Sequence, residues 1–234
     1  MRLLYSKPGP RIKKILSLAK EAGISCSVSD TETLDTLVQS LPAAARDHRG
    51  IVLCIEGASK TAENIVDFDA QIAAFKENSG TTYTVLVLDS VTDPHNVGAV
   101  LRSCDQFGIS LVVMPERRGA HDISENDVIA RTSAGASAWV PVAIVKNLVR
   151  SVQQLKDAGF WIYGADAGGT SVQDLHFAQK TALIMGSEGN GIGRLLGEQC
   201  DTVVSIPTCG KIDSLNVSVA AGVLLYEIYR QKLN

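Results

Sequence analysis

The sequence lacks the features of a membrane-spanning, secreted or metal-binding protein. No apolar run approaches the roughly 18 residues that a membrane-spanning helix needs, and the N-terminus, MRLLYSKPGPRIKK, has no apolar core of the signal-peptide type. The five cysteines form no CxxC pair, and no histidine lies near them at metal-ligand spacing. Scattered cysteines of odd number are typical of reduced thiols in a cytosol. We therefore expect a cytoplasmic protein that binds neither a membrane nor a metal ion.

Excess basic charge is also missing from the chain as a whole. The formal net charge of −3 and the pI of about 5.8 do not by themselves indicate a nucleic-acid-binding protein. The distribution is uneven, because residues 1–20 contain no acidic side chain. Their basic residues are Arg2, Lys7, Arg11, Lys13, Lys14 and Lys20. This cluster is either a solvated helix face or a phosphate-contacting patch.

The first part of the chain predicts a small βαβ-type unit over residues 1–56. The expected elements are strands at 3–5, 24–28 and 50–55 and helices at 11–22 and 33–40. The unit starts abruptly, with a strand almost at Met1, and so short a segment can build only a thin core. Residues 57–82 are mostly polar, and we interpret them as a linker with one short helix at most.

Residues 83–234 predict a second, larger α/β domain in which strands and helices alternate. Strands are expected at 84–89, 110–115, 160–165, 183–185 and 203–206, and helices at 97–107, 125–131, 147–158, 193–199 and 215–231. The strands are continuous apolar runs and do not alternate with polar residues. Such runs are typical of a mostly parallel sheet that helices cover on both faces.

Two of these strands, Leu183 to Met185 and Val203 to Ile206, end in loops of glycine, proline and polar residues, and each loop leads into a helix. Ligands of open α/β sheets bind in the crevice between such loops, so we expect the active site within residues 183–227. The loop SEGNGIG resembles a dinucleotide-binding turn, but that turn follows the first strand of its fold. Here too little chain follows Gly193 to build the rest of that fold. We interpret the glycines as permitting close approach of the main chain to a ligand.

Several polar residues lie in or next to predicted helices, at positions where helix packing alone does not explain a polar side chain. Asn96 lies at a helix entry, and Arg102 lies on an otherwise apolar helix, where a half-buried guanidinium needs an acidic partner or a phosphate. Ser214 is the expected N-cap of the helix at 215–231, and Asn216 in its first turn needs a hydrogen-bond partner. That helix is apolar nearly all round, so we expect a core helix that also suits a subunit interface.

Three stretches in this order resemble the sequence motifs of the SPOUT superfamily of methyltransferases. They are LDSVTDPHNVGAVLRS, LIMGSEGNGIG and SIPTCGKIDSLNVSVAAGVLLYE. The likeness extends over residues 83–234 and is closest to the RNA ribose 2′-O-methyltransferases, in particular to those that methylate a guanosine of bacterial 23S ribosomal RNA.

The resemblance implies an α/β fold with a mostly parallel sheet and a C-terminal trefoil knot, the SPOUT α/β-knot. It implies a methyltransferase domain at 83–234, a linker at 57–82, and at 1–56 a small RNA-binding domain similar to a ribosomal protein. The usual opening strand and helix of that small domain are absent here. The implied cofactor is S-adenosylmethionine, and the implied partners are a second copy of the chain and RNA, with ribosomal RNA preferred over transfer RNA.

The resemblance also assigns candidate site residues. The positions that match functional side chains of the family are Asn96, Arg102, Glu188, Ser214 and Asn216. The positions that match its donor-binding loops are Ala165, Gly186, Gly189, Ile206 and Leu215.

We hypothesise that Arg102 binds an RNA phosphate and that its field lowers the pKa of the ribose hydroxyl, because a guanidinium hardly deprotonates. Glu188 would orient Arg102 or the ribose. The remaining alternatives are a transfer RNA ribose methyltransferase and a non-catalytic RNA-binding or assembly factor with the same fold.

Overall fold

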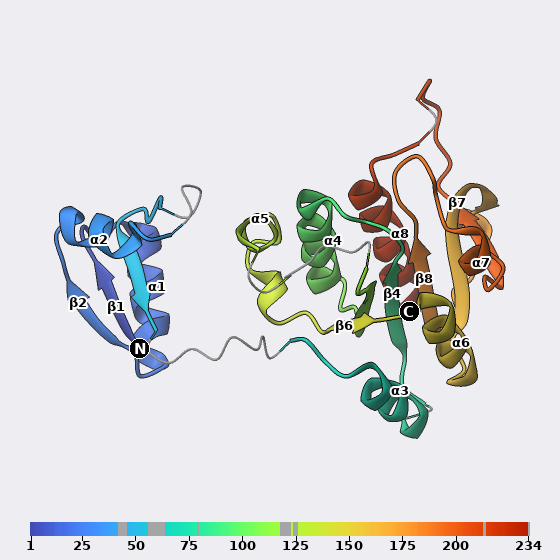
Figure 1. Cartoon of the computed structure of the whole chain (residues 1–234), viewed down its shortest axis with the longest axis horizontal. Coiled ribbons are helices and arrows are strands. Elements are labelled where there is room, and N and C mark those ends of the chain that lie inside the picture. The colour runs from blue at the N-terminus through green and yellow to red at the C-terminus, as the bar shows by residue number, and fades with distance from the viewer. Residues whose placement is uncertain are drawn as a thin grey trace. The chain divides into compact units, whose positions relative to one another are not determined.

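The computed structural model describes residues 1–41, 46–55, 64–78, 80–117, 123, 126–212 and 214–233. The chain divides into two compact units, Met1–Lys60 and Thr61–Asn234, and Figure 1 shows the elements of both. Among the described residues, no helix combines the length and the apolarity that crossing a membrane requires.

The first unit is a three-stranded sheet with two helices. Strand β1 (Arg2–Tyr5) lies between β2 (Ser25–Val28), to which it is parallel, and β3 (Ile51–Cys54), to which it is antiparallel. Helix α1 (Pro10–Glu21) connects β1 to β2, and α2 (Thr31–Val38) follows β2. The elements occur in the predicted order. The core is small and consists of Leu3, Leu4, Ile12, Ala19, Leu34 and Val38.

The second unit contains a six-stranded sheet in the order β6-β5-β4-β8-β7-β9, with every pairing parallel. Its strands are β4 (Tyr83–Leu88), β5 (Leu111–Pro115), β6 (Val142–Val145), β7 (Trp161–Ser171), β8 (Lys180–Met185) and β9 (Thr202–Ser205). The mostly parallel sheet predicted from the apolar runs is therefore confirmed.

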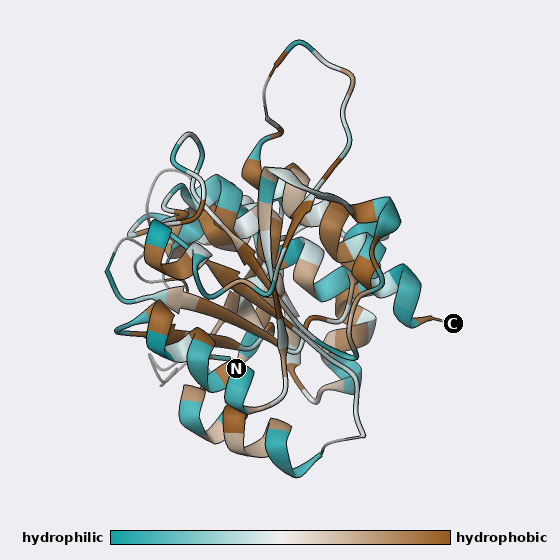
Figure 2. Ribbon diagram, turned by 90° about the vertical axis from the view of Figure 1, so that its right-hand side faces the viewer, coloured by the Kyte–Doolittle hydropathy of each residue, from teal (hydrophilic) through white to brown (hydrophobic). Residues whose placement is uncertain are grey.

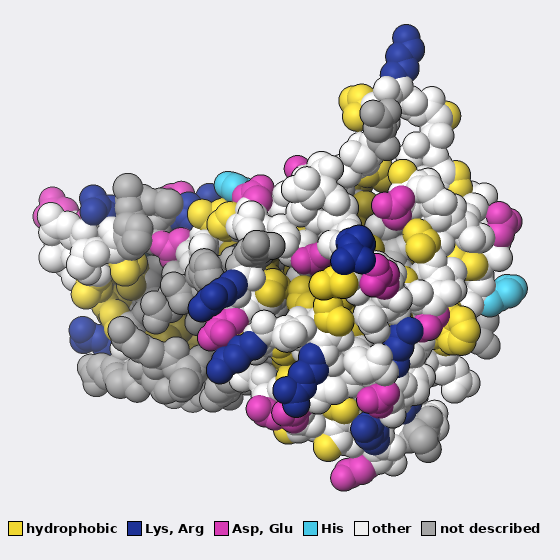
Figure 3. Space-filling view, turned by 45° about the vertical axis from the view of Figure 1, so that its right-hand side comes forward, with side chains coloured by type: hydrophobic (Ala, Val, Ile, Leu, Met, Phe, Trp, Pro, Cys, Tyr) yellow, Lys and Arg dark blue, Asp and Glu magenta, His cyan; other side chains and the backbone are white. Residues whose placement is uncertain are grey.

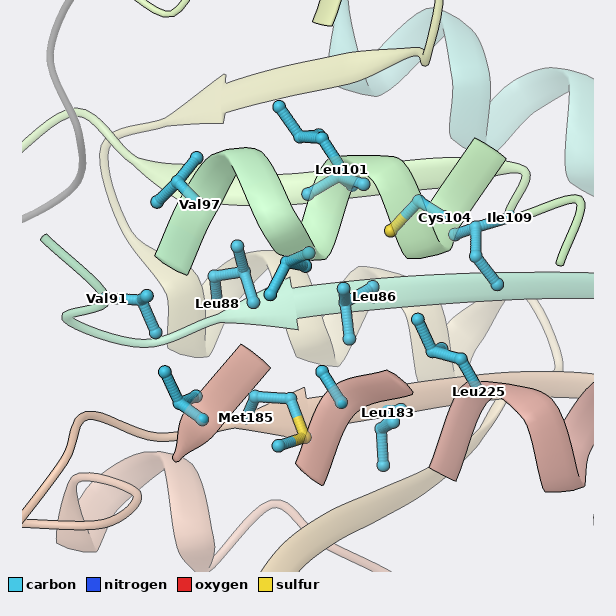
Figure 4. Close-up of a cluster of buried hydrophobic side chains, with 14 of the residues drawn as sticks. Leu86, Leu88, Val91, Val97, Leu101, Cys104, Ile109, Leu183, Met185 and Leu225 are labelled. Atoms are coloured by element: carbon cyan, nitrogen blue, oxygen red, sulfur yellow. The ribbon is translucent and has the colours of Figure 1, made fainter. Parts of the chain in front are cut away.

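Helices cover both faces of this sheet. They are α3 (Phe68–Glu77), α4 (Pro94–Gln106), α5 (Asp127–Thr132), α6 (Leu148–Asp157), α7 (Arg194–Gly197) and α8 (Val217–Lys232), with short 3-10 turns η2 (Ala136–Ala138) and η3 (Val172–Asp174). Successive residues of a strand point to opposite faces. Leu86 and Leu183 therefore pack against α4 and α8 (Figure 4), whereas Val85 and Ala182 pack against α3, α6 and α7. Two cores explain why the strands are apolar throughout, as the central strands in Figure 2 show.

The single short helix allowed within the predicted linker at 57–82 is present as α3, but it packs as part of the second unit. Helix α3 buries Phe68, Ile72 and Phe75 in the second core, and the ring of Phe75 lies 4.5 Å from that of Tyr83. These apolar residues recur at helical spacing, but the surrounding polar residues obscured the stripe. The chain therefore belongs to the second unit from Asn64 onward, and residues 57–63 lie outside the described part.

The last helix departs from its prediction in two ways. Its N-cap is Asn216 and not Ser214, because the Asn216 side-chain oxygen accepts the Ser218 N–H at 2.9 Å. Its outer face is also solvent-exposed, with Val219 at 51% and Tyr226 at 52% exposure, so the expected core helix is buried on one side only in a single chain. The buried face, which includes Leu224 and Leu225, packs on the sheet beside α4.

Candidate active site

The carboxyl ends of β7, β8 and β9 surround a cavity of about 810 Å³. The segments after β8 and after β9 both line this cavity, as we predicted from the two loops that follow these strands in the sequence. All five predicted donor-binding residues lie in its wall, namely Ala165, Gly186, Gly189, Ile206 and Leu215. Glu188 and Ser214 line it as well. Beyond Ile206, the segment from Pro207 to Ile212 is exposed and projects from the unit (Figures 1 and 3).

The loop after β8 is a turn whose close packing requires glycine. A Cβ on Gly186 would lie 2.1 Å from the carbonyl carbon of Gly191, which no side chain could occupy. Ser187 and Gly191 exchange two backbone hydrogen bonds, of 3.1 and 3.0 Å, across the turn. Gly189 and Gly191 have φ values of +85° and +62°, which L-residues adopt rarely. The glycines of this loop therefore serve its backbone shape.

The third wall of the cavity is an irregular part of β7 that sequence reasoning missed. Val204 of β9 pairs with both Ala165 and Thr170, so residues 166–169 bulge out of the ladder. Asp166 and Gly169 thereby line the cavity. A Cβ on Gly169 would lie 2.6 Å from the Val203 carbonyl. The Gly-Gly pair after an apolar strand was the available signal, because glycine inside a strand often marks a bulge.

Three predicted catalytic residues from three different segments meet at the cavity rim. The Glu188 Oε1 accepts hydrogen bonds from the Asn216 Nδ2 at 2.7 Å, from the Asn96 Nδ2 at 3.2 Å and from the Val217 N–H at 3.3 Å. The Asn216 Nδ2 also donates to the Asn96 Oδ1 at 3.0 Å. The carboxylate thus lies at the N-terminus of α8, where the helix dipole favours negative charge. The partner that Asn216 was expected to need is Glu188.

Arg102 does not join this network. Its side chain is exposed on α4, and it makes no ion pair or side-chain hydrogen bond within the described part of the chain. The expected half-buried position is therefore wrong for the single chain, and of the alternatives left open for Arg102 and Glu188, the acidic partner and the direct contact between the two are not found in the described residues. The physical reason is that α4 turns its buried stripe, which includes Val97 and Leu101, toward the sheet and leaves Arg102 outside.

The cavity favours a cation over an anion. Its described lining residues include two carboxylates, Asp166 and Glu188, and no lysine or arginine. The rest of the lining consists of apolar side chains such as Met185 and Leu224, of glycine backbone and of uncharged serine and threonine side chains. Burial raises the pKa of the Cys104 thiol above its ordinary range and that of Cys200 to about 11. These thiols remain protonated at neutral pH and are poor nucleophiles. Within the described residues, no three His, Cys, Asp or Glu side chains form a metal site.

Known proteins are similar to this chain in sequence and in fold. Residues 83–226 match the model of the SpoU rRNA Methylase family. An uncharacterized tRNA/rRNA methyltransferase of Borreliella burgdorferi is 38% identical, over 99% of this chain and 98% of its own.

Two solved structures show the same fold. One is the SpoU methyltransferase AviRb from Streptomyces viridochromogenes in complex with AdoMet, with a TM-score of 0.68 and 24% identity over 100% of this chain and 83% of that one. The other is an RNA 2′-O ribose methyltransferase, with a TM-score of 0.68 and 22% identity over 100% of this chain and 81% of that one. The family match and the Borreliella relative together place the chain: it belongs to the SpoU rRNA Methylase family.

Proposed function

We propose that the protein transfers a methyl group from S-adenosylmethionine to a ribose 2′-hydroxyl of structured RNA. The observation that carries this proposal is the 810 Å³ cavity, whose rim joins Asn96, Glu188 and Asn216 in one hydrogen-bonded network. The donor is suggested by the AdoMet complex of AviRb, and the acceptor by the name of the RNA 2′-O ribose methyltransferase.

The chemistry of the cavity fits S-adenosylmethionine. Small-molecule sites usually measure about 300–1,000 Å³, and this one lies within that range. Apolar residues such as Met185 and Leu215 suit an adenosyl group, and the exposed loop backbone suits its polar edges. Asp166 and Glu188 suit a ligand with a positively charged sulfonium and ammonium, and they disfavour the phosphates of a dinucleotide. When bound, the donor supplies a methyl group that its cationic sulfur already activates.

The residues of the chain would supply position and charge. A ribose hydroxyl is a weak nucleophile, so its alignment with the donor is a large part of the barrier reduction. Glu188, held by Asn96 and Asn216, would fix the loop that faces both reactants. Arg102, whose guanidinium has no ion pair or hydrogen bond among the described residues, would bind an RNA phosphate and lower the pKa of the hydroxyl by its field.

The first unit would bind RNA. Four cations of α1, Arg11, Lys13, Lys14 and Lys20, are exposed, and exposed cations on one helix suit contact with a phosphate backbone. We retain the interpretation of this unit as a small RNA-binding domain that resembles a ribosomal protein.

A homodimer would cover the exposed face of α8. Val219, Val223 and Tyr226 are exposed there, and the ring of Phe107, directly after α4, lies 5.8 Å from that of Tyr226. An apolar helix face next to the cavity suits a second copy of the chain. Sedimentation of wild type and of Val223→Glu tests this, with a dimer expected for the first and a monomer for the second. We also retain the trefoil knot of the C-terminal segment as a prediction from the family resemblance.

Ribosomal RNA, with a guanosine of 23S RNA as the first choice, is the proposed substrate, and transfer RNA is the alternative. The Borreliella relative is named for both RNAs. Such an enzyme would act in the cytoplasm. The test is to map 2′-O-methylation across total RNA before and after addition of protein and donor. A new site in 23S RNA or in transfer RNA decides between the two. Donor binding without any new methylation would refute the proposed reaction, and absence of donor binding would favour a non-catalytic RNA-binding factor.

A further inference from the structure

One acidic residue outside the cavity holds both ends of the glycine-rich loop. Asp89 follows β4 directly, and its N–H donates to the Met185 carbonyl at 2.8 Å, where the chain leaves β8. Its Oδ2 accepts the Gly193 N–H at 2.8 Å, where the chain enters α7. The two contacts bracket residues 186–192, which carry Glu188 and line the cavity.

Local geometry is adapted to this contact on both sides. A Cβ on Gly193 would lie 3.1 Å from the Asp89 Oδ2, so the missing side chain lets the carboxylate approach. Ser90 has a φ of +59°, which is uncommon for a residue other than glycine. In this conformation its hydroxyl donates to the other Asp89 oxygen at 3.1 Å. Both carboxylate oxygens therefore have a partner.

The connection from β4 to α4 contacts the glycine-rich loop a second time at Asn96, seven residues after Asp89. Asn96, at the start of α4, donates to Glu188 at 3.2 Å. The β4–α4 connection and the glycine-rich loop are thus joined at two points, one at Asp89 and one at Asn96. The Asp89 contacts fix the ends of the loop, whereas the Asn96 and Asn216 amides and the Val217 N–H hold the carboxylate of Glu188 within it.

We propose that Asp89 is a positioning residue for methyl-donor binding, acting through the loop 186–193. The carboxylate itself is not part of the cavity wall, so it acts on the donor only through the loop backbone and Glu188. This inference rests on the proposed use of S-adenosylmethionine. It assigns Asp89 a part in donor affinity that is separate from its contribution to folding.

The test is titration calorimetry of the full-length protein with S-adenosylmethionine. Asp89→Ala removes the acceptor, and we expect roughly tenfold weaker donor binding, the size typical for loss of one charge-assisted hydrogen bond. Asp89→Asn keeps an oxygen for the Gly193 N–H and should stay within about threefold of wild type. Gly193→Ala crowds the same contact from the other side and should also weaken binding.

Asp67→Ala is the matched control, because Asp67 also accepts a backbone N–H, that of Ala70, at 2.8 Å but caps α3 away from the cavity. It should lower the melting temperature about as much as Asp89→Ala does and leave donor affinity unchanged. Unchanged donor affinity in Asp89→Ala, or in Gly193→Ala if the first does not fold, overturns the inference. If Asp89→Asn and Asp89→Ala lose the same amount of donor affinity, the inference is overturned as well. A wild type that binds no donor instead refutes the proposed function, and this inference with it.

Discussion

Glu188→Gln is the substitution that tests the site most directly, because it changes charge and leaves shape almost intact. Three donors converge on the Glu188 Oε1, from the side chains of Asn96 and Asn216 and from the Val217 N–H. Glutamine presents an amide oxygen to the same donors, but it lacks the negative charge. Its own NH₂ cannot face those donors without repulsion, so the new side chain has one acceptable orientation.

The expected loss follows from these contacts. Hydrogen bonds to a charged group contribute about 1.5–3 kcal/mol, and those between neutral groups roughly half as much. Glu188 is exposed at the cavity rim, so water competes for the carboxylate and the lower end applies. A loss of about 1–2 kcal/mol corresponds to roughly a 5–30-fold decrease in rate.

The assay is single-turnover methyl transfer from radiolabelled S-adenosylmethionine to total RNA, with enzyme in excess. The matched control is Glu198→Gln, since Glu198 is an exposed acid on the same connection and its ion pair in the described structure is with Arg194, away from Glu188. We expect the control to retain the wild-type rate. Adding Asn96→Ala to Glu188→Gln should cost less than the sum of the two single losses, because both side chains belong to one network. Equal rates for Glu188→Gln and wild type would remove Glu188 from the mechanism.

Other substitutions test separate parts of the molecule. Gly186→Ala places a Cβ 2.1 Å from the Gly191 carbonyl carbon, so calorimetry should show at least tenfold weaker donor binding, whereas Gly197→Ala, with open space around its Cβ, should bind as wild type does. Arg102→Ala should weaken RNA binding and reduce the slope of log affinity against log salt by about one phosphate contact, with donor affinity unchanged; an unchanged slope would refute the phosphate contact. Burial lowers the pKa of Lys232 to about 8, so the unfolded chain binds more protons between about pH 8 and 10.5 and stability should rise with pH there. The pKa shift limits the gain in the free energy of unfolding to about 3 kcal/mol, and the partial exposure of Lys232 reduces this gain to on the order of 1–2 kcal/mol. Denaturant unfolding of Lys232→Met should lack this rise; an equal rise in both proteins would contradict the assignment.

The sequence was most informative where one local signal determined the structure. The apolar runs of β4, β5 and β8 were unambiguous because both faces of the sheet are covered. The sequence was least informative where polar residues on either side hid the helical spacing of a few apolar ones. Helix α3 shows this, because its buried Phe68, Ile72 and Phe75 lie within residues 57–82, a longer and mostly polar stretch that resembled a linker.

The site could be predicted as a set of residues but not as a geometry. The hydrogen bonds of Asn216 to Asn96 and to Glu188 join residues 120 and 28 positions apart, and no local pattern encodes which polar groups will pair at that range. The position of Arg102 was predicted wrongly for a different reason. Its helix looked apolar in sequence, but only one face of α4 is buried, and Arg102 lies outside that face. Asp166 was missed because a bulge in β7 carries it to the cavity, and a bulge shifts side chains off the regular alternation.

The register of two central strands explains why the loops of the site meet at all. Strands β4 and β8 pair in parallel with Leu88 opposite Met185, so both end at the same level of the sheet. Their loops therefore leave side by side, and Asp89 can reach both Met185 and Gly193. A one-residue shift of β8 against β4 would turn each of its side chains to the opposite face. It would also move the start of the glycine-rich loop by about 3.3 Å along the strand, which is enough to break a 2.8 Å hydrogen bond at Gly193. The two separate cores on the sheet faces thus fix the register on which the geometry of the cavity depends, because Leu183 and Ile184 pack on opposite sides and so hold the level at which the loop with Glu188 begins.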